Sequence, residues 1–223
     1  MPMRIDERRV SVVFENVAVL ERLMRDGLRE GVDYYTDLFP GQTKPVLGDG
    51  GAQVIMNAFD AYARHHVLEH VEEGAKGEER IRYVVKAEIV HRFTGVVLAE
   101  GLGSASSDEV KYKYRWVEEE TLKEEYGYAD EELESLPSRT KKRKKDGEWV
   151  TVKEYRVRNP EILDLSNTIL KMAAKRAEVD AVMALPGVSR IFTQDLGERK
   201  ASRQKSAPKP PPTGDLSDLA SGP

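Results

Sequence analysis

The stretch from Asn167 to Val182 has the strongest helical periodicity in the chain, so it constrains the fold more than any other segment. One face repeats at intervals of three or four residues, and its members are Ile169, Met172, Ala173, Arg176, Val179 and Val182. A neighbouring face repeats in the same way through Lys171, Lys175 and Glu178. We therefore expect a long amphipathic helix that buries its apolar face and carries cations beside it.

Residues 80–90 have a different period, because charged and bulky side chains alternate there. Thr94 and Gly95 predict a turn after this strand, and residues 96–101 predict an antiparallel return strand. Residues 67–71 are a further candidate strand. These segments together predict a β-meander that comes before the long helix in the chain.

The N-terminal part is expected to be helical. Residues 14–30 read as an amphipathic helix, residues 31–51 contain the glycines and prolines of a loop, and residues 52–65 read as a second helix. The predicted fold class is α+β, with a curled antiparallel β-meander of about three to five strands packed on a long helix. An N-terminal helical part and a disordered C-terminal tail complete it.

The domain organisation follows from shifts in composition. We expect an N-terminal helix and loop over residues 1–50 and an α+β core over residues 51–196. A charged insertion interrupts this core at residues 107–158. Residues 197–223 are rich in lysine, serine and proline, a composition that predicts a disordered tail.

Composition excludes several classes of protein. The chain has 223 residues and no cysteine, so disulfides, zinc ribbons and thiol catalysis are excluded. No apolar run is long enough to predict a transmembrane helix or a signal-peptide core, so no membrane partner is expected. We expect a cytoplasmic protein.

Charge is segregated along the chain, although the net charge is only −4. Residues 118–134 hold nine acids and one lysine, a local charge of −8, whereas residues 139–158 hold nine bases and three acids, a local charge of +6. Such a chain can bind phosphate locally while its total is acidic, and the plainer alternative is two solvated faces that pair with each other. The basic run at residues 141–145 is expected to be a flexible loop.

No catalytic site and no cofactor are expected. Residues 66–70 spell H-x-x-E-H, the inverted zinc-peptidase motif, which needs both histidines one helical turn apart. In a strand the two histidines would stand about 13 Å apart, at roughly 3.3 Å per residue. The apolar Val67, Leu68 and Val71 favour a strand, so we do not expect a metal site.

Two sets of residues suit nucleic-acid binding. Arg80, Arg82 and Lys86 form a cationic ridge on one strand face. A second set alternates the cations Lys111, Lys113 and Arg115 with the aromatic residues Tyr112, Tyr114 and Trp116. Lysine and arginine neutralise phosphates, and aromatic rings stack on unpaired bases without reading sequence. The alternative for each set is an ordinary solvated sheet face.

Several segments together resemble a known family. They are the stretches 167–177 and 180–182, the stretch 189–196, the Glu30–Tyr34 segment, the Pro-Gly and Lys-Pro loop at 40–45, and the hairpin with Thr94-Gly95 and Ala99-Glu100-Gly101. Over roughly residues 28–106 and 156–196 the chain resembles the phage and mobile-element single-strand annealing proteins of the Rad-fifty-two and Erf superfamily.

This resemblance implies a curled β-meander braced by a long helix, with protomers joined edge to edge into rings or filaments. It implies ATP-independent binding and annealing of single-stranded DNA in phage-type recombination or repair, along a basic groove. Single-stranded DNA and further copies of the chain are the implied partners, with a single-strand binding protein or an exonuclease beside them. Lys44, Lys171, Lys175 and Arg176 become candidates for the groove, together with the two sets above.

The sequence departs from the family at one point and leaves two alternatives open. Asp49 and Gly50 stand where relatives carry a lysine before the Gly-Ala step.

One alternative function is a protein-interaction module, such as a phage accessory protein or inhibitor that uses the acidic part of the insertion. The other is a metal-dependent hydrolase that uses His66, Glu69 and His70.

Overall fold

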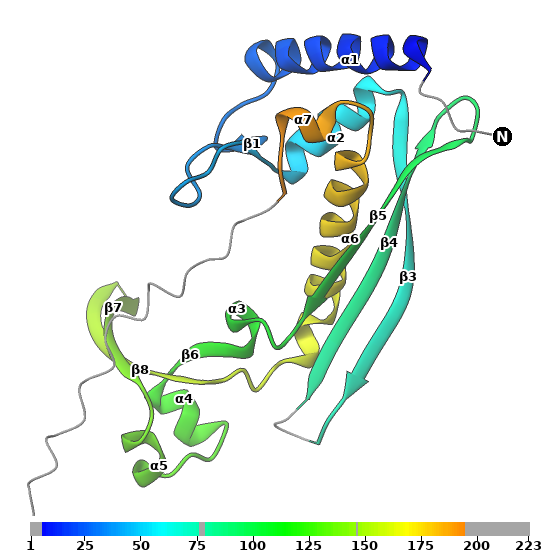
Figure 1. Ribbon diagram of the computed structural model, residues 1–223. Coiled ribbons are helices and arrows are strands. Elements are labelled where there is room, and N and C mark those ends of the chain that lie inside the picture. Colours follow the sequence, from blue (N-terminus) through cyan, green and yellow to red (C-terminus); the bar gives the residue numbers. More distant parts are fainter. Residues whose placement is uncertain (1–5, 76–78, 146, 195–223) are drawn as a thin grey trace, which may run out of the picture.

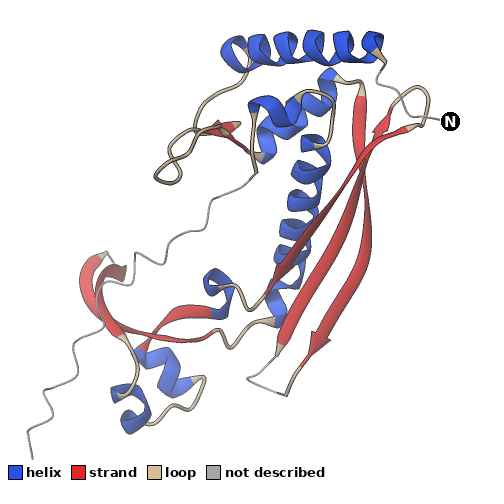
Figure 2. Ribbon diagram, viewed as in Figure 1, coloured by secondary structure: helices blue, strands red, loops and turns tan. Residues whose placement is uncertain are grey.

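The main sheet is three-stranded and antiparallel, with strand order β3-β4-β5, and it lies along one side of the molecule (Figure 1). Its strands are β3 (Ala61–Glu73), β4 (Arg80–His91) and β5 (Val97–Ser106). The helix α6 (Ser166–Met183) packs along one face of this sheet. The computed structural model describes residues 6–75, 79–145 and 147–194, and within these ranges α6 lies beside the main sheet and α1 (Glu7–Asp26) lies across its end (Figure 2).

The contact between α6 and β5 brings two backbones together. Ala173, Ala177 and Ala181 are fully buried at four-residue intervals, and they face Gly101 and Gly103 of β5. A Cβ atom on Gly103 would lie 2.2 Å from the Ala177 backbone nitrogen, and one on Gly101 would lie 2.2 Å from the Ala181 nitrogen. Only small residues on both elements allow this approach, which gives many dispersion contacts along the seam.

The main hydrophobic core lies between the inner face of the sheet and α6, and it continues to the end of the molecule where three helices gather. These helices are α1 (Glu7–Asp26), α2 (Asp49–Ala58) and α7 (Val188–Ile191). The ribbon of β1 (Tyr34–Tyr35) and β2 (Val46–Leu47) lies between α1 and α2 in the chain. Side chains from all these layers are buried together, including Leu20, Leu47, Ile55, Ile89, Val182 and Phe192. Each large apolar side chain buried here contributes about 1.5–3 kcal/mol.

Residues 107–158, the expected charged insertion, fold into a second sheet of order β6-β8-β7. Its strands are β6 (Tyr114–Glu118), β7 (Ser138–Lys145) and β8 (Glu148–Arg158), and the short helix α3 (Val110–Lys113) comes before β6. Between β6 and β7 lie α4 (Glu119–Glu124) and α5 (Asp130–Glu134). These two helices pack on the second sheet through a small core of Val117, Leu122, Leu133, Tyr155 and Val157. The 3₁₀ turn η1 (Leu163–Leu165) then leads into α6.

The α+β class, the antiparallel meander and the long helix are confirmed, but the expectation of a curled sheet is wrong, because the sheets are not curled. The backbones of α6 and β5 approach closely at Gly101 and again at Gly103. This contact requires β5 to run alongside α6 over that length. A curled sheet would move part of β5 away from the helix. The later strands form their own sheet rather than extending the meander.

The second predicted helix ends earlier than expected. Residues 52–65 were expected to be helical, whereas α2 ends at Ala58 and β3 begins at Ala61. Asp60 has a φ of +50°, and no other non-glycine residue among those described has a positive φ. Aspartate tolerates this left-handed conformation better than most residues, so it ends the helix and reverses the chain without a glycine.

The basic run at residues 141–145 belongs to strand β7, so the expectation of a flexible loop is wrong. The N-terminal helix also differs from its predicted bounds of 14–30, because α1 runs from Glu7 to Asp26 and its C-cap is Gly27. No helix within the described ranges is long and apolar enough to cross a membrane. The expected tail over residues 197–223 lies outside the described residues.

Candidate nucleic-acid interface

The outer face of the main sheet, away from α6, carries the three cations that the alternation along β4 predicts. Arg80, Arg82 and Lys86 all lie on this face, so the predicted register is confirmed. The structure also pairs them with carboxylates that the sequence did not indicate. Arg80 Nε lies 2.7 Å from Asp108 Oδ2, and Arg82 Nε lies 3.6 Å from Glu69 Oε1. The ridge is therefore cationic in sequence but largely balanced in charge.

Lys86 belongs to a network centred on Glu88. Lys86 Nζ donates to Glu88 Oε1 at 2.6 Å and to Glu100 Oε1 at 3.1 Å. Arg64 donates to Glu88 Oε2 through two nitrogens, at 2.6 and 2.9 Å, and His66 Nε2 lies 3.2 Å from the same oxygen. The hydrogen bond from Lys86, followed by that from Arg64, lowers the pKa of Glu88 to about 2. The positive charge of Lys86 is therefore balanced by Glu88 and Glu100.

The Glu88 network predicts a dependence of stability on acid. The folded-state pKa of Glu88, about 2, lies below the ordinary value of 4.5, so the unfolded chain takes up the proton first. The stability from this group is therefore present above pH 4.5 and is lost as the pH falls toward about 2. We expect Glu88→Gln to reduce the loss of stability in this interval, measured by urea unfolding at successive pH values.

Glu100→Gln is the matched control for this experiment, because Glu100 shares Lys86 but its side chain is 56% exposed. The control should keep the acid dependence of the unchanged protein. Parallel acid profiles for Glu88→Gln and the unchanged protein would contradict the central role of Glu88.

The set of alternating cations and aromatic residues at 111–116 does not form one continuous surface. Lys111 and Lys113 lie on α3, and Tyr112 between them packs against the main core. Tyr114 and Arg115 lie on the following strand, β6. Arg115 forms an ion pair with Glu161, which also accepts a hydrogen bond from the Tyr126 hydroxyl at 2.7 Å. Arg115 therefore pairs with a carboxylate that follows β8, whereas Lys111 and Lys113 pair with Glu109 and Asp108.

A different group of cations is brought together where β4, α3 and α6 meet, and we call it the junction cluster. It consists of Arg80, Lys111, Lys113 and Arg176 with the carboxylates Asp108 and Glu109. Arg176 donates bidentate hydrogen bonds to the Glu109 carboxylate at 2.7 and 2.8 Å. It also donates to the Ser104 carbonyl at 2.6 Å. The hydrogen bond from Arg176 lowers the pKa of Glu109 below its ordinary value.

The junction cluster carries more positive than negative charge. Its four cations face Asp108 and Glu109, and Glu73 adds a third carboxylate 3.9 Å from Arg80. Lys113 Nζ lies 3.9 Å from Asp108 and Lys111 Nζ lies 3.5 Å from Glu109. The four cationic side chains are between 34% and 47% exposed, so solvent and ions reach them.

The remaining candidates on α6 differ from one another. Lys171 is exposed and makes no ion pair or hydrogen bond within the described part of the chain. Lys175 Nζ donates to Asp49 Oδ2 at 2.6 Å, which raises the pKa of Lys175. Lys44 lies at the other end of the molecule, where its Nζ donates to the Ser189 carbonyl at 2.8 Å. Lys44 is therefore not brought together with the junction cluster.

Glu178, expected beside the lysines of α6, is instead buried under α2 and β3. Gln53 donates a hydrogen bond to its carboxylate, and His65 Nε2 lies 3.4 Å from it. Burial raises the pKa of Glu178 and lowers the pKa of His65. Gln53, His65 and Glu178 therefore connect α2, β3 and α6 in the interior, away from any surface that could bind DNA.

The H-x-x-E-H segment at residues 66–70 lies within β3, so the predicted strand is confirmed. A bulge at Leu68 changes the register, which places His66 on the outer face and His70 on the inner face. The His70 ring stacks on Tyr83 with centroids 4.4 Å apart. The two histidines therefore lack the helical spacing that the peptidase motif needs. Among the described residues no group of three or more potential ligands could hold a metal ion.

The sequence reasoning missed the two residues that organise the junction cluster. Asp108 and Glu109 lie in the short turn between β5 and α3, and nothing in their local sequence marks them as partners of cations from β4 and α6. Asp49 and Gly50, where the sequence departs from the family, begin α2, and Asp33 packs against this turn. Asp33 accepts from the Gly48 nitrogen through its carbonyl at 2.9 Å, and its carboxylate lies against Gly50 at the start of α2.

No known protein family, no curated protein and no solved structure matches this chain.

Proposed function

We propose that this protein binds single-stranded DNA and anneals complementary strands, without ATP and without a catalytic residue. Annealing needs phosphate neutralisation, an extended strand and bases that stay free to pair. The observation that carries the proposal is the junction cluster, where cations from three separate elements converge with a surplus of positive charge. The resemblance to the Rad-fifty-two and Erf superfamily supports the same activity.

The internal ion pairs of the junction cluster are compatible with this role. The exposed pairs of Lys111 and Lys113, at 3.5 and 3.9 Å, contribute about 0–1 kcal/mol each, so a phosphate can displace their carboxylates at small cost. The carboxylates also hold the cations in place before the strand arrives, which reduces the entropy lost on binding. Lys171 on α6, which is exposed and has no partner within the described residues, is a further cation available to a strand, outside the junction cluster.

The edges of the main sheet support an oligomeric form. Within the described residues β3 and β5 pair only with β4, so each leaves one edge free. Both edge strands carry exposed apolar side chains, among them Val67 and Leu68 on β3 and Leu98 and Leu102 on β5. Free edges of this kind pair readily with another strand. Pairing β3 of one copy with β5 of the next is a head-to-tail contact, which gives a ring or a filament.

Binding of a fluorescent single-stranded oligonucleotide, measured over a range of salt concentrations, tests the proposal. Four phosphates neutralised at the junction cluster predict a slope of about −3 for log affinity against log salt. Particle images should show rings or filaments with the oligonucleotide. Absence of binding at low salt would contradict the proposal. A protein partner bound without any affinity for DNA would favour an interaction module that uses the acidic helices α4 and α5.

A further inference from the structure

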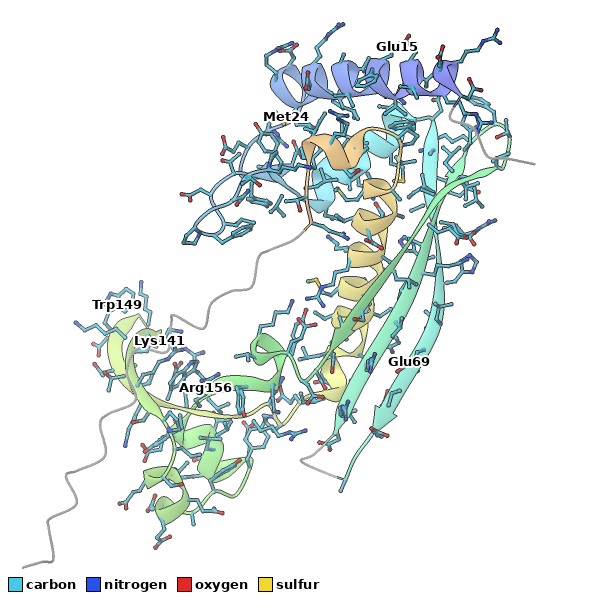
Figure 3. The ribbon with its side chains drawn as sticks, viewed as in Figure 1. Glu15, Met24, Glu69, Lys141, Trp149 and Arg156 are labelled. Atoms are coloured by element: carbon cyan, nitrogen blue, oxygen red, sulfur yellow. The ribbon has the colours of Figure 1, made fainter. Side chains whose placement is uncertain are left out.

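The β7–β8 hairpin projects from the second sheet and has two chemically different faces (Figures 1 and 3). Cross-strand pairs share a face of an antiparallel ribbon. The pairs Lys144 with Trp149 and Lys142 with Thr151 therefore lie on one face. The pairs Arg143 with Val150, Lys141 with Val152 and Arg139 with Glu154 lie on the other.

On the face that holds Arg139, Lys141 and Arg143, carboxylates already neutralise the cations. Arg139 contacts Glu154 at 2.6 Å, and Lys141 Nζ lies 3.9 Å from the same carboxylate. Arg143 forms an ion pair with Glu118 of β6. The Arg139 guanidinium also stacks over the Trp116 ring, 4.4 Å from its centroid. This face is stabilised by contacts within the protein.

The opposite face, which we call the Trp149 face, holds two cations without carboxylate partners among the described residues, Lys142 and Lys144, whereas its third cation, Lys153, interacts electrostatically with Glu119. Its members are Thr140, Lys142, Lys144, Trp149, Thr151 and Lys153, and all six are exposed. Within the described residues Lys142 and Lys144 make no ion pair or hydrogen bond, and Lys153 lies over the Tyr155 ring. Helices α4 and α5 cover this face only at its base, through Tyr155.

Trp149 is the most informative member of this face, because its side chain is 72% exposed and lies directly across the ribbon from Lys144. Figure 3 shows it at the outer end of the hairpin. At this exposure the indole contributes little to either hydrophobic core. An exposed indole beside free ammonium groups provides a stacking surface for a base and charges for its phosphates.

We propose that the Trp149 face is a second binding site for single-stranded DNA, in addition to the junction cluster. The site takes unpaired bases, because the bases of a duplex are stacked on each other and cannot lie on the indole. The proposal rests on the proposed function and deepens it, since a strand held at one site can be presented to a strand held at the other.

Tryptophan fluorescence tests this directly, because the chain has only two tryptophans, Trp116 and Trp149. In a Trp116→Phe variant the emission reports Trp149 alone. Titration with a short oligothymidylate should quench this emission, and a duplex of the same length should leave it largely unchanged. Lys142→Ala with Lys144→Ala should weaken binding about tenfold, and so should Trp149→Ala.

The opposite face supplies the matched control. Lys141→Ala with Arg143→Ala removes the same charge from the same strand, but these two cations lie on the face opposite Trp149, so affinity should change by less than about twofold. If the oligonucleotide binds while Trp149 emission stays constant, the second site is wrong and the proposed function stands. If no oligonucleotide binds at all, both fail. Equal losses in the two double variants would also overturn the second site.

Discussion

Replacing Gly103 by alanine should destabilise the protein by about 3 kcal/mol or more, because it inserts a methyl group between two backbones. The added Cβ would lie 2.2 Å from the Ala177 nitrogen and 2.3 Å from the Ala173 carbonyl oxygen. Neither atom can rotate away, since both belong to the α6 backbone. The helix must therefore move off the sheet, and the dispersion contacts of the whole seam weaken.

Urea unfolding of Gly103→Ala and Ser104→Ala separates this effect from the general effect of placing an alanine in β5. Ser104 is the next residue of β5, and its exposed side chain lies on the outer face of the sheet. Ser104→Ala should change the free energy of unfolding by less than about 0.5 kcal/mol. A Gly103→Ala variant with the same unfolding midpoint as the unchanged protein would contradict the close packing of α6 on β5.

The contact between α6 and β5 also illustrates which parts of the fold can be predicted from the sequence. Residues 80–90 and 167–182 were placed within one residue of the observed β4 and α6, because each repeats a strong local period. The period did not identify Ala177 and Ala181 as buried, since a small side chain contributes little to a hydrophobic pattern. Their importance follows from the glycines on another element, which only the folded chain brings near.

The second sheet was missed for a related reason. The segment 141–145 consists only of lysine and arginine, a composition that indicates a solvated loop. It forms a strand because β8 supplies the backbone partners and because Glu118 and Glu154, which lie near Arg143 and Lys141, neutralise part of its charge. Similarly, Asp60 ends α2 with a positive φ, which a helical pattern does not indicate.

The candidate site was predicted in its residue types but not in its grouping. Arg80 and Arg176 were proposed from two separate patterns, and the fold brings both to Asp108 and Glu109. Arg115, from the same run as Lys111, is instead directed to Glu161. Local spacing shows which cations share one element, whereas their final partners depend on tertiary contacts.

Reversing the charge of two cations in the junction cluster should have the largest effect on DNA binding. Lys111→Glu with Lys113→Glu removes two charge-assisted contacts to phosphate and adds repulsion, so the affinity for a single strand should fall at least about a hundredfold. The salt slope should become shallower by about 1.4, since fewer counterions are released. Oligonucleotide binding at several salt concentrations measures both quantities. Thermal unfolding should change little, because the lost ion pairs are exposed.

A control with the same change in net charge distinguishes this local site from attraction by the whole molecule. Arg8→Glu with Arg9→Glu places the reversal on α1, where both side chains are exposed and lie at the other end of the molecule from α3 (Figure 1). This control should retain most of the affinity, since exposed charges farther apart than about 10 Å are screened at moderate salt. If the two double variants lose affinity equally, binding depends on net charge alone. The junction cluster would then hold its cations for the stability of the fold, with no role in holding a strand.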